Sequence, residues 1–138
     1  MYIIARNYKK VYVLSLIGQY DSKFNKNTIK LSDEHVSHIG SKCVITYGYE
    51  NCLYVFDLNS WQKFITNLDA LSFSREARNI CRYFCANAEN IDIINNTIYV
   101  PKRLQKYFNK NVVVLGVLDH LEIWDKEEYI NYDYGSIV

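Results

Sequence analysis

Apolar and polar residues follow two different periods along this chain, one typical of strands and one typical of helices. Apolar runs over residues 42–49 and 52–56 have the length of buried strands. After them, Trp61, Phe64 and Leu68 recur at the spacing of one helical face, and Ser60 is placed to cap that helix. A second helical stripe covers residues 74–88. The pattern therefore predicts a protein of the α+β class.

The same order of elements occurs twice, because two segments of the chain match at a constant offset. The pairs Gly48 and Gly116, Leu53 and Leu121, Asp57 and Asp125, and Trp61 and Tyr129 are each 68 positions apart. Upstream, residues 27–31 match residues 96–100 at an offset of 69, so one single-residue gap reconciles the two offsets. Chance agreement does not extend over this many spaced positions. We interpret the chain as an internal duplication.

Each repeat is predicted to run strand, tight turn, strand, short helix, strand, strand, helix. In the first repeat the turn falls at residues 25–27 and the short helix at residues 33–39. In the second, strands at 90–94 and 97–100 flank a turn at Asn95 and Asn96, and a short helix runs from Pro101 through Phe108. Asn suits such turns because it tolerates a left-handed backbone. A repeat of roughly 65 residues is marginal alone, so we expect the two repeats to share one core.

Composition changes this picture mainly through the distribution of charge. The formal net charge is +1, so the chain as a whole is not a polybasic nucleic-acid binder. Residues 1–30 nevertheless carry six Lys or Arg and one Asp, whereas residues 119–138 carry six Asp or Glu and one Lys. A basic start and an acidic end can attract phosphate at one face or pair copies of the protein.

The chain shows no apolar run near the roughly 18–20 residues of a membrane span. Its first 16 residues lack the continuous apolar core of a signal peptide. We therefore expect a cytoplasmic protein with its cysteines as thiols. Cys81 and Cys85 fall one helical turn apart on an apolar stripe, so we expect buried side chains there and no redox pair.

Candidate catalytic and metal-binding groups do not assemble into a known arrangement. His35 and His38 share a short helix, but zinc needs three or four convergent ligands, so we expect surface or partly buried histidines and no metal. Asp119, His120 and Glu122 are acid–base types, yet no nucleophile elbow or phosphate-binding glycine loop accompanies them. We interpret them as an amphipathic edge strand. The sequence predicts no catalytic residues, no cofactor and no small-molecule substrate.

Residues 116–126, Gly-Val-Leu-Asp-His-Leu-Glu-Ile-Trp-Asp-Lys, resemble a signature of the MraZ family of bacterial transcription regulators. In that family a Gly-x-x-Asp-x-x-Glu-hydrophobic-Trp-Asp string ends the second repeat, and residues 48–53 resemble the matching segment of the first. The resemblance runs from about residue 17 to residue 132. It implies a tandem duplicated swapped-hairpin β-barrel of the AbrB type, with pseudo-twofold symmetry and peripheral helices.

The resemblance also implies the organisation of the chain. Residues 1–16 are an N-terminal extension, in which residues 11–14 can form an extra edge strand. The first AbrB-like repeat spans 17–70, a connecting helix 71–88, the second repeat 89–132 and a tail 133–138.

The function implied is that of a DNA-binding transcriptional regulator in the cytoplasm and nucleoid. The family acts as ring-shaped homo-oligomers on repeated promoter elements of the division and cell-wall gene cluster. Its repeats carry a DNA-contacting Arg in the first turn, where this chain has Thr28 and Thr97. Thr offers one hydroxyl and no charge. The alternative is therefore an oligomeric scaffold or interaction protein that kept the fold and lost specific DNA recognition.

Side chains around the two turns are the candidate DNA contacts. Lysines beside the first turn can replace the charge of the missing Arg, though not its two-pronged geometry. The predicted DNA-binding residues are Lys23, Lys26, Asn27, Thr28, Lys30, Asn95, Asn96, Thr97, Lys102 and Arg103. The expected partners are double-stranded DNA and further copies of the chain, with no membrane.

Overall fold

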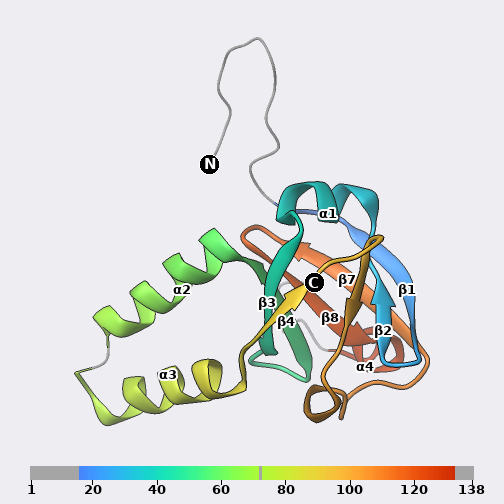
Figure 1. Ribbon diagram of the computed structural model, residues 1–138. Helices are drawn as coiled ribbons and strands as arrows, with labels where there is room; N and C mark the ends of the chain where they lie inside the picture. The colour runs from blue at the N-terminus through green and yellow to red at the C-terminus, as the bar shows by residue number, and fades with distance from the viewer. Residues whose placement is uncertain (1–15, 72, 133–138) are drawn as a thin grey trace.

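A computed structural model describes residues 16–71 and 73–132, so the predicted strand at residues 11–14 lies outside the described part. Within that part, eight strands form one antiparallel sheet in the order β5-β3-β4-β8-β7-β1-β2-β6 (Figure 1). A bridge between Ile94 and Thr97 links the strands at its two ends, so the sheet is a nearly closed barrel. The strands are β1 (Gln19–Asn25), β2 (Thr28–Lys30), β3 (Lys42–Tyr47), β4 (Cys52–Asp57), β5 (Glu89–Asp92), β6 (Thr97–Tyr99), β7 (Asn111–Val117) and β8 (His120–Asp125).

Helices surround this barrel, which confirms the predicted α+β class. They are α1 (Asp33–Ile39), α2 (Leu58–Ala70), α3 (Arg75–Asn87) and α4 (Lys126–Ile130), with a single 3₁₀ turn, η1 (Lys102–Leu104). The α2–α3 pair forms a helical hairpin that projects from one side of the barrel (Figure 1).

The two repeats exchange strands, as the resemblance implied. Strand β1 of the first repeat pairs with β7 of the second, and β5 of the second pairs with β3 of the first. Strand β2 lies against β6 and β4 against β8, so these elements meet their own counterparts. Ile29 and Ile98 face each other at the centre of the β2–β6 pair, and both are fully buried. A pseudo-twofold axis through this pair relates the two repeats.

Both predicted turns are two-residue hairpins with a left-handed backbone. The φ angles are 53° and 68° at Lys26 and Asn27, and 53° and 58° at Asn95 and Asn96. Positive φ at both central residues defines a type I′ turn, whose twist matches that of the strands it joins. The backbone of the two repeats is therefore equivalent at the turns. This holds even at Lys26, although Lys tolerates a positive φ less well than Asn does.

The glycines and aspartates shared by the repeats have structural reasons. A Cβ at Gly48 would lie 2.7 Å from the Cys52 Sγ, and a Cβ at Gly116 would meet the backbone of Ile17. Asp57 accepts a hydrogen bond from the N–H of Ser60 at 3.4 Å. The prediction that Ser60 caps α2 is wrong, because the carboxylate of Asp57 caps that helix and α2 begins at Leu58.

One apolar core fills the barrel and is drawn from both repeats, as predicted. It joins Ile29, Leu53 and Val55 of the first repeat to Ile98 and Leu121 of the second. A second, aromatic cluster lies between the barrel and the helical hairpin. Its buried members include Phe56, Phe84 and Trp124, and Trp61, Phe64 and Leu68 of α2 pack against the cluster. The hairpin is thus anchored at its base by ring contacts.

Several local predictions were wrong. Cys85 is exposed and Cys81 only partly buried, because just one side of α3 faces α2 and the barrel. His35 is buried, and its Nε2 lies 2.9 Å from the carbonyl of Ile17. The helix predicted from Pro101 through Phe108 is confined to η1. The last two residues of the predicted helix, Tyr107 and Phe108, instead pack against the core, and the centroid of the Phe108 ring lies 5.5 Å from that of Phe24.

The acidic strand is also placed differently from the expectation of an edge. Strand β8 lies between β4 and β7 in the middle of the sheet. Glu122 pairs with Tyr54 there, and it accepts a hydrogen bond from the Trp124 indole at 2.9 Å. Its polar character therefore serves contacts within the fold.

Candidate nucleic-acid interface

The ribbon formed by β2 and β6 brings Thr28 and Thr97, which stand where Arg was expected, onto one outer face. Thr28 lies opposite Tyr99 and Lys30 lies opposite Thr97, while the alternating Ile side chains point inward. Side chains alternate across a strand, so these four residues share the outward face. The strand pairing thus joins predicted site residues that are about 70 positions apart in sequence.

A shallow hollow of about 350 Å³ lies on this face. Four predicted site residues line it: Lys23, Thr28, Lys30 and Thr97. Lys23 of β1 also donates a hydrogen bond to Asn111 Oδ1 at 2.8 Å. The hollow is open and lined by two lysines and one carboxylate, that of Asp21, which is paired with Lys126. It therefore offers positive charge to a ligand that approaches from outside and does not enclose one.

The two threonines hold the turns together. The Thr28 hydroxyl donates to the carbonyl of Asn25 at 2.8 Å, and the Thr97 hydroxyl donates to the carbonyl of Asn95 at 3.0 Å. Each hydroxyl proton is therefore used within its own turn, which leaves only oxygen lone pairs facing outward. Thr in place of Arg removes a donor as well as a charge at both turns.

Each turn lies against the short helix or 3₁₀ turn of the other repeat. Asn27 Oδ1 accepts a hydrogen bond from Gln105 Nε2 at 2.9 Å, next to η1. Asn96 Nδ2 donates to the Asp33 carboxylate in the first turn of α1. The turns consequently lie at opposite ends of the β2–β6 ribbon, in different surroundings.

Three of the predicted lysines are free to meet a ligand. Lys26, Lys30 and Lys102 are exposed, and their ammonium groups have no hydrogen-bond or ion-pair partner within residues 16–71 and 73–132. A larger hollow of about 790 Å³ nearby adds Lys110 and Lys126, which are not among the predicted DNA-binding residues. Acidic side chains line that hollow too, so its charge is balanced.

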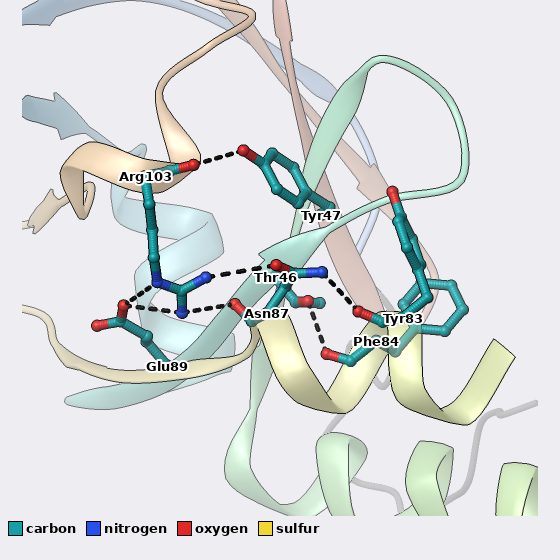
Figure 2. Close-up of polar contacts among 7 residues, drawn as sticks. All are labelled: Thr46, Tyr47, Tyr83, Phe84, Asn87, Glu89 and Arg103. Carbon is teal, nitrogen blue, oxygen red and sulfur yellow. Dashed lines mark hydrogen bonds and ion pairs between the residues drawn. The ribbon is translucent and has the colours of Figure 1, made fainter. Parts of the chain in front are cut away.

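Arg103 is engaged elsewhere (Figure 2). Its Nη2 lies 2.8 Å from the Glu89 carboxylate and donates to the Asn87 carbonyl at 3.1 Å. The Arg103 carbonyl accepts a hydrogen bond from the Tyr47 hydroxyl. The guanidinium thus links η1 to the carboxyl end of α3, and its charge is compensated by Glu89. Glu89 and Asn87 lie 14 and 16 positions before Arg103 on other elements, and such pairing leaves no periodic signal in a sequence.

The Thr46 hydroxyl fixes the same helix one turn earlier. It is fully buried and donates to the Phe84 carbonyl at 2.9 Å (Figure 2). The contact satisfies a buried hydroxyl and holds α3 against β3. Together with the Arg103 contacts, it positions η1 and hence the neighbouring Lys102.

One group in the described chain has ligand types that can hold a metal. The side-chain ligand atoms of Glu50, Cys52 and Glu122 all lie within 4.8 Å of one another. A thiol must lose its proton to bind a metal, and burial followed by the two carboxylates raises the pKa of Cys52. Those conditions oppose ligation by the thiol, and the absence of a metal stays a prediction.

His120 is the ionisable side chain of β8 with the closest carboxylates. Its Nδ1 lies 2.7 Å from Asp119 and its Nε2 lies 3.8 Å from Glu122. Burial alone would lower the pKa of His120, but the contacts with the Glu122 and Asp119 carboxylates, of which that with Asp119 is a hydrogen bond, outweigh burial and raise it. The ring also packs 4.5 Å from the Tyr54 ring, between centroids. The two carboxylates therefore favour the protonated form of this packed imidazole.

Comparison with known proteins decides the family. Residues 25–82 and 87–134 match the family described as "MraZ protein", in two separate blocks. The chain belongs to the MraZ family. The transcriptional regulator MraZ of Lachnoclostridium phytofermentans is 30% identical over 125 residues, 88% of this chain and 89% of the relative. Relatives with the same description in Clostridium beijerinckii and Thermoanaerobacter sp. are each 31% identical over 88–89% of this chain and 89–90% of their own.

Membership in the MraZ family confirms the resemblance read from residues 116–126 and supports the double swapped-hairpin fold. The family is non-enzymatic, and its members are named for transcription regulation. No helix in the described part of the chain is long and apolar enough to cross a membrane.

Proposed function

We propose that this chain is a transcription regulator that binds double-stranded DNA through the outer face of β1, β2 and β6 and the adjoining first turn. The supporting observation is the convergence of Lys23 and Lys30 on one hollow, with the free ammonium of Lys26 on the turn that joins β1 to β2. Lysines bind phosphate as point charges, so this face favours the DNA backbone over individual bases.

The number of free lysines bears on the mode of binding. Each phosphate contact contributes a slope of about −0.9 to the dependence of log affinity on log salt concentration. With Lys26, Lys30 and Lys102 as contacts, one subunit reaches a slope of about −3 and binds weakly. A ring-shaped homo-oligomer on repeated promoter elements multiplies such contacts through avidity. We therefore include the ring, the promoter of the division and cell-wall gene cluster, and a cytoplasmic, nucleoid-associated location in the proposal.

A salt series with matched lysine variants tests the proposal. Fluorescence anisotropy of a labelled duplex that carries repeated promoter elements is measured with the wild type, Lys30→Gln and Lys63→Gln. Lys63 lies exposed near the middle of α2, outside the proposed face, so it controls for net charge. We expect Lys30→Gln to weaken binding and reduce the salt slope by about 1, with Lys63→Gln near wild type. Equal losses from both variants would contradict the proposed face.

The scaffold alternative has its own supporting observation. Leu71 and Phe73, at the tip of the helical hairpin, are 58% and 84% exposed, and both turn threonines spend their hydroxyl protons internally. Exposed apolar residues at a projecting tip suit protein contacts. Self-association without any DNA binding at low salt would favour this function over the first.

A further inference from the structure

The pseudo-twofold axis makes the surroundings of the two turns comparable residue by residue. Lys26 and Asn95 occupy the same turn position with the same φ of 53°, and both are exposed. Asn27 and Asn96 follow, at 68° and 58°. Differences in side chain at these positions are therefore differences in chemistry on one backbone.

The charges beside the two turns are opposite. Ser32 precedes α1 and Pro101 precedes η1 at equivalent positions, so the first helical residues are Asp33 in one repeat and Lys102 in the other. The next equivalent pair is Glu34 and Arg103, and Arg103 is compensated by Glu89. We define the basic end as Lys26, Asn27 and Lys102, and the acidic end as Asn95, Asn96, Asp33 and Glu34.

Hydrogen bonds of the turn side chains show which helical element lies at each end. Gln105 binds the Asn27 side chain at the basic end, and Asp33 binds the Asn96 side chain at the acidic end. Asn27 lies opposite Val100 and Asn96 opposite Leu31, so the two ends are about four strand residues, or roughly 13 Å, apart. That separation exceeds the Debye length of about 8 Å at physiological ionic strength, so a phosphate at the basic end is largely screened from the carboxylates at the acidic end. Lys30 lies opposite Thr97, one residue from the acidic turn, and offsets part of the negative charge of Asp33 and Glu34 there.

The backbone at Lys26 adds a second, independent observation. A type I′ turn favours Asn or Gly at this position, and the second repeat has Asn95 there. Lys at positive φ is strained, and such strain persists where it serves a function. The ammonium of Lys26 is not used within the described residues, so its role lies outside the fold.

We propose that, of the two turns, only the one at the basic end contacts DNA phosphates, where Lys26 and Lys102 add to the strand contacts of Lys23 and Lys30, and that the turn at the acidic end makes no phosphate contact. The inference rests on the proposed DNA binding and narrows the predicted site, which included both turns. It makes the two repeats unequal in function, although their backbones are equivalent.

Exchange of the two turn residues tests the inference at constant net charge. The variants are Lys26→Asn, Asn95→Asp and the double variant Lys26→Asn with Asn95→Lys, titrated against the promoter duplex by anisotropy across a salt series. We expect roughly fivefold weaker binding and a salt slope reduced by about 1 for Lys26→Asn. Asn95→Asp, which changes the charge by the same amount, should stay within about twofold of the wild type. The double variant should be as weak as Lys26→Asn.

Each contrary result identifies which idea has failed. Recovery of wild-type affinity in the double variant, or equal losses from Lys26→Asn and Asn95→Asp, would overturn the one-ended contact and leave the proposed function standing. A wild-type protein that does not bind the duplex at low salt would overturn both. Circular dichroism and thermal unfolding of every variant separate lost contacts from lost folding.

Discussion

Arg103 is paired with Glu89, whereas the neighbouring Lys102 is exposed and unpaired within the described residues. This difference allows a structural role to be separated experimentally from a DNA-contacting role. Arg103 and Glu89 form an ion pair whose side chains are 44% and 37% exposed, so the pair contributes about 0.2–1 kcal/mol. The additional donation from Arg103 to the Asn87 carbonyl adds about 0.5–1.5 kcal/mol. Removing both partners, by Glu89→Ala with Arg103→Ala, should therefore destabilise the fold by about 1–2 kcal/mol.

The net charge of this double variant equals that of the wild type, which isolates stability from electrostatics. A loss of that size lowers the melting temperature by about 4–8 °C in a chain of this length. DNA affinity, measured well below the melting temperature, should remain within about twofold. Lys102→Ala is the matched control, because this exposed neighbour should cost under about 0.5 kcal/mol while weakening DNA binding. Urea unfolding and anisotropy provide the two measurements.

One pattern of results would refute this reasoning. If the double variant unfolds at the wild-type urea concentration and loses DNA affinity as Lys102→Ala does, Arg103 contacts DNA and its pairing with Glu89 is incidental. The original prediction of Arg103 as a DNA contact would then stand.

Three further predictions concern the fold. Ile29→Ala and Ile98→Ala should each destabilise by about 2–5 kcal/mol, and the double variant should be non-additive because the side chains face each other; full additivity in urea unfolding would argue against the shared axis. Lys26→Asn should raise stability by about 0.5–1 kcal/mol by relieving the positive φ, and an unchanged melting temperature would contradict this. The raised pKa of His120 stabilises the fold fully below its unfolded value of 6.5, and this contribution is lost as pH rises through the folded value. The stability difference between wild type and His120→Gln should therefore be larger at about pH 5.5 than at about pH 9, and a constant difference would contradict the shift.

The sequence predicts well those features that repeat or that depend on local backbone chemistry. The match at offsets of 68 and 69 predicts the duplication, and Asn-containing turns predict both hairpins. Gly48 and Gly116 match because neither site has room for a Cβ. Such constraints act on single positions, so they leave the same residue in both repeats.

Features that depend on contacts between separate elements cannot be predicted from the sequence in the same way. Arg103 meets Glu89 and Asn87 only because the fold brings η1 beside the end of α3. The exposure of Cys85 and the central position of Glu122 likewise follow from which surfaces are covered by other elements. Helical and strand periods describe one element at a time, so they predicted a buried thiol and an edge strand where neither exists.

Burial separates the positions at which the two repeats agree from those at which they differ. Positions that the barrel constrains, such as Ile29 with Ile98, are the same in both halves and fully buried. Positions at the turn ends, where the backbone is equally fixed but side chains meet solvent, carry opposite charge, as Asp33 and Lys102 do. A symmetric core therefore supports an asymmetric surface, because burial energy depends on shape shared by both halves whereas exposed charge costs the fold little. Loss of the turn Arg from both repeats thus need not abolish DNA binding, since one end alone can supply the charge that phosphate requires.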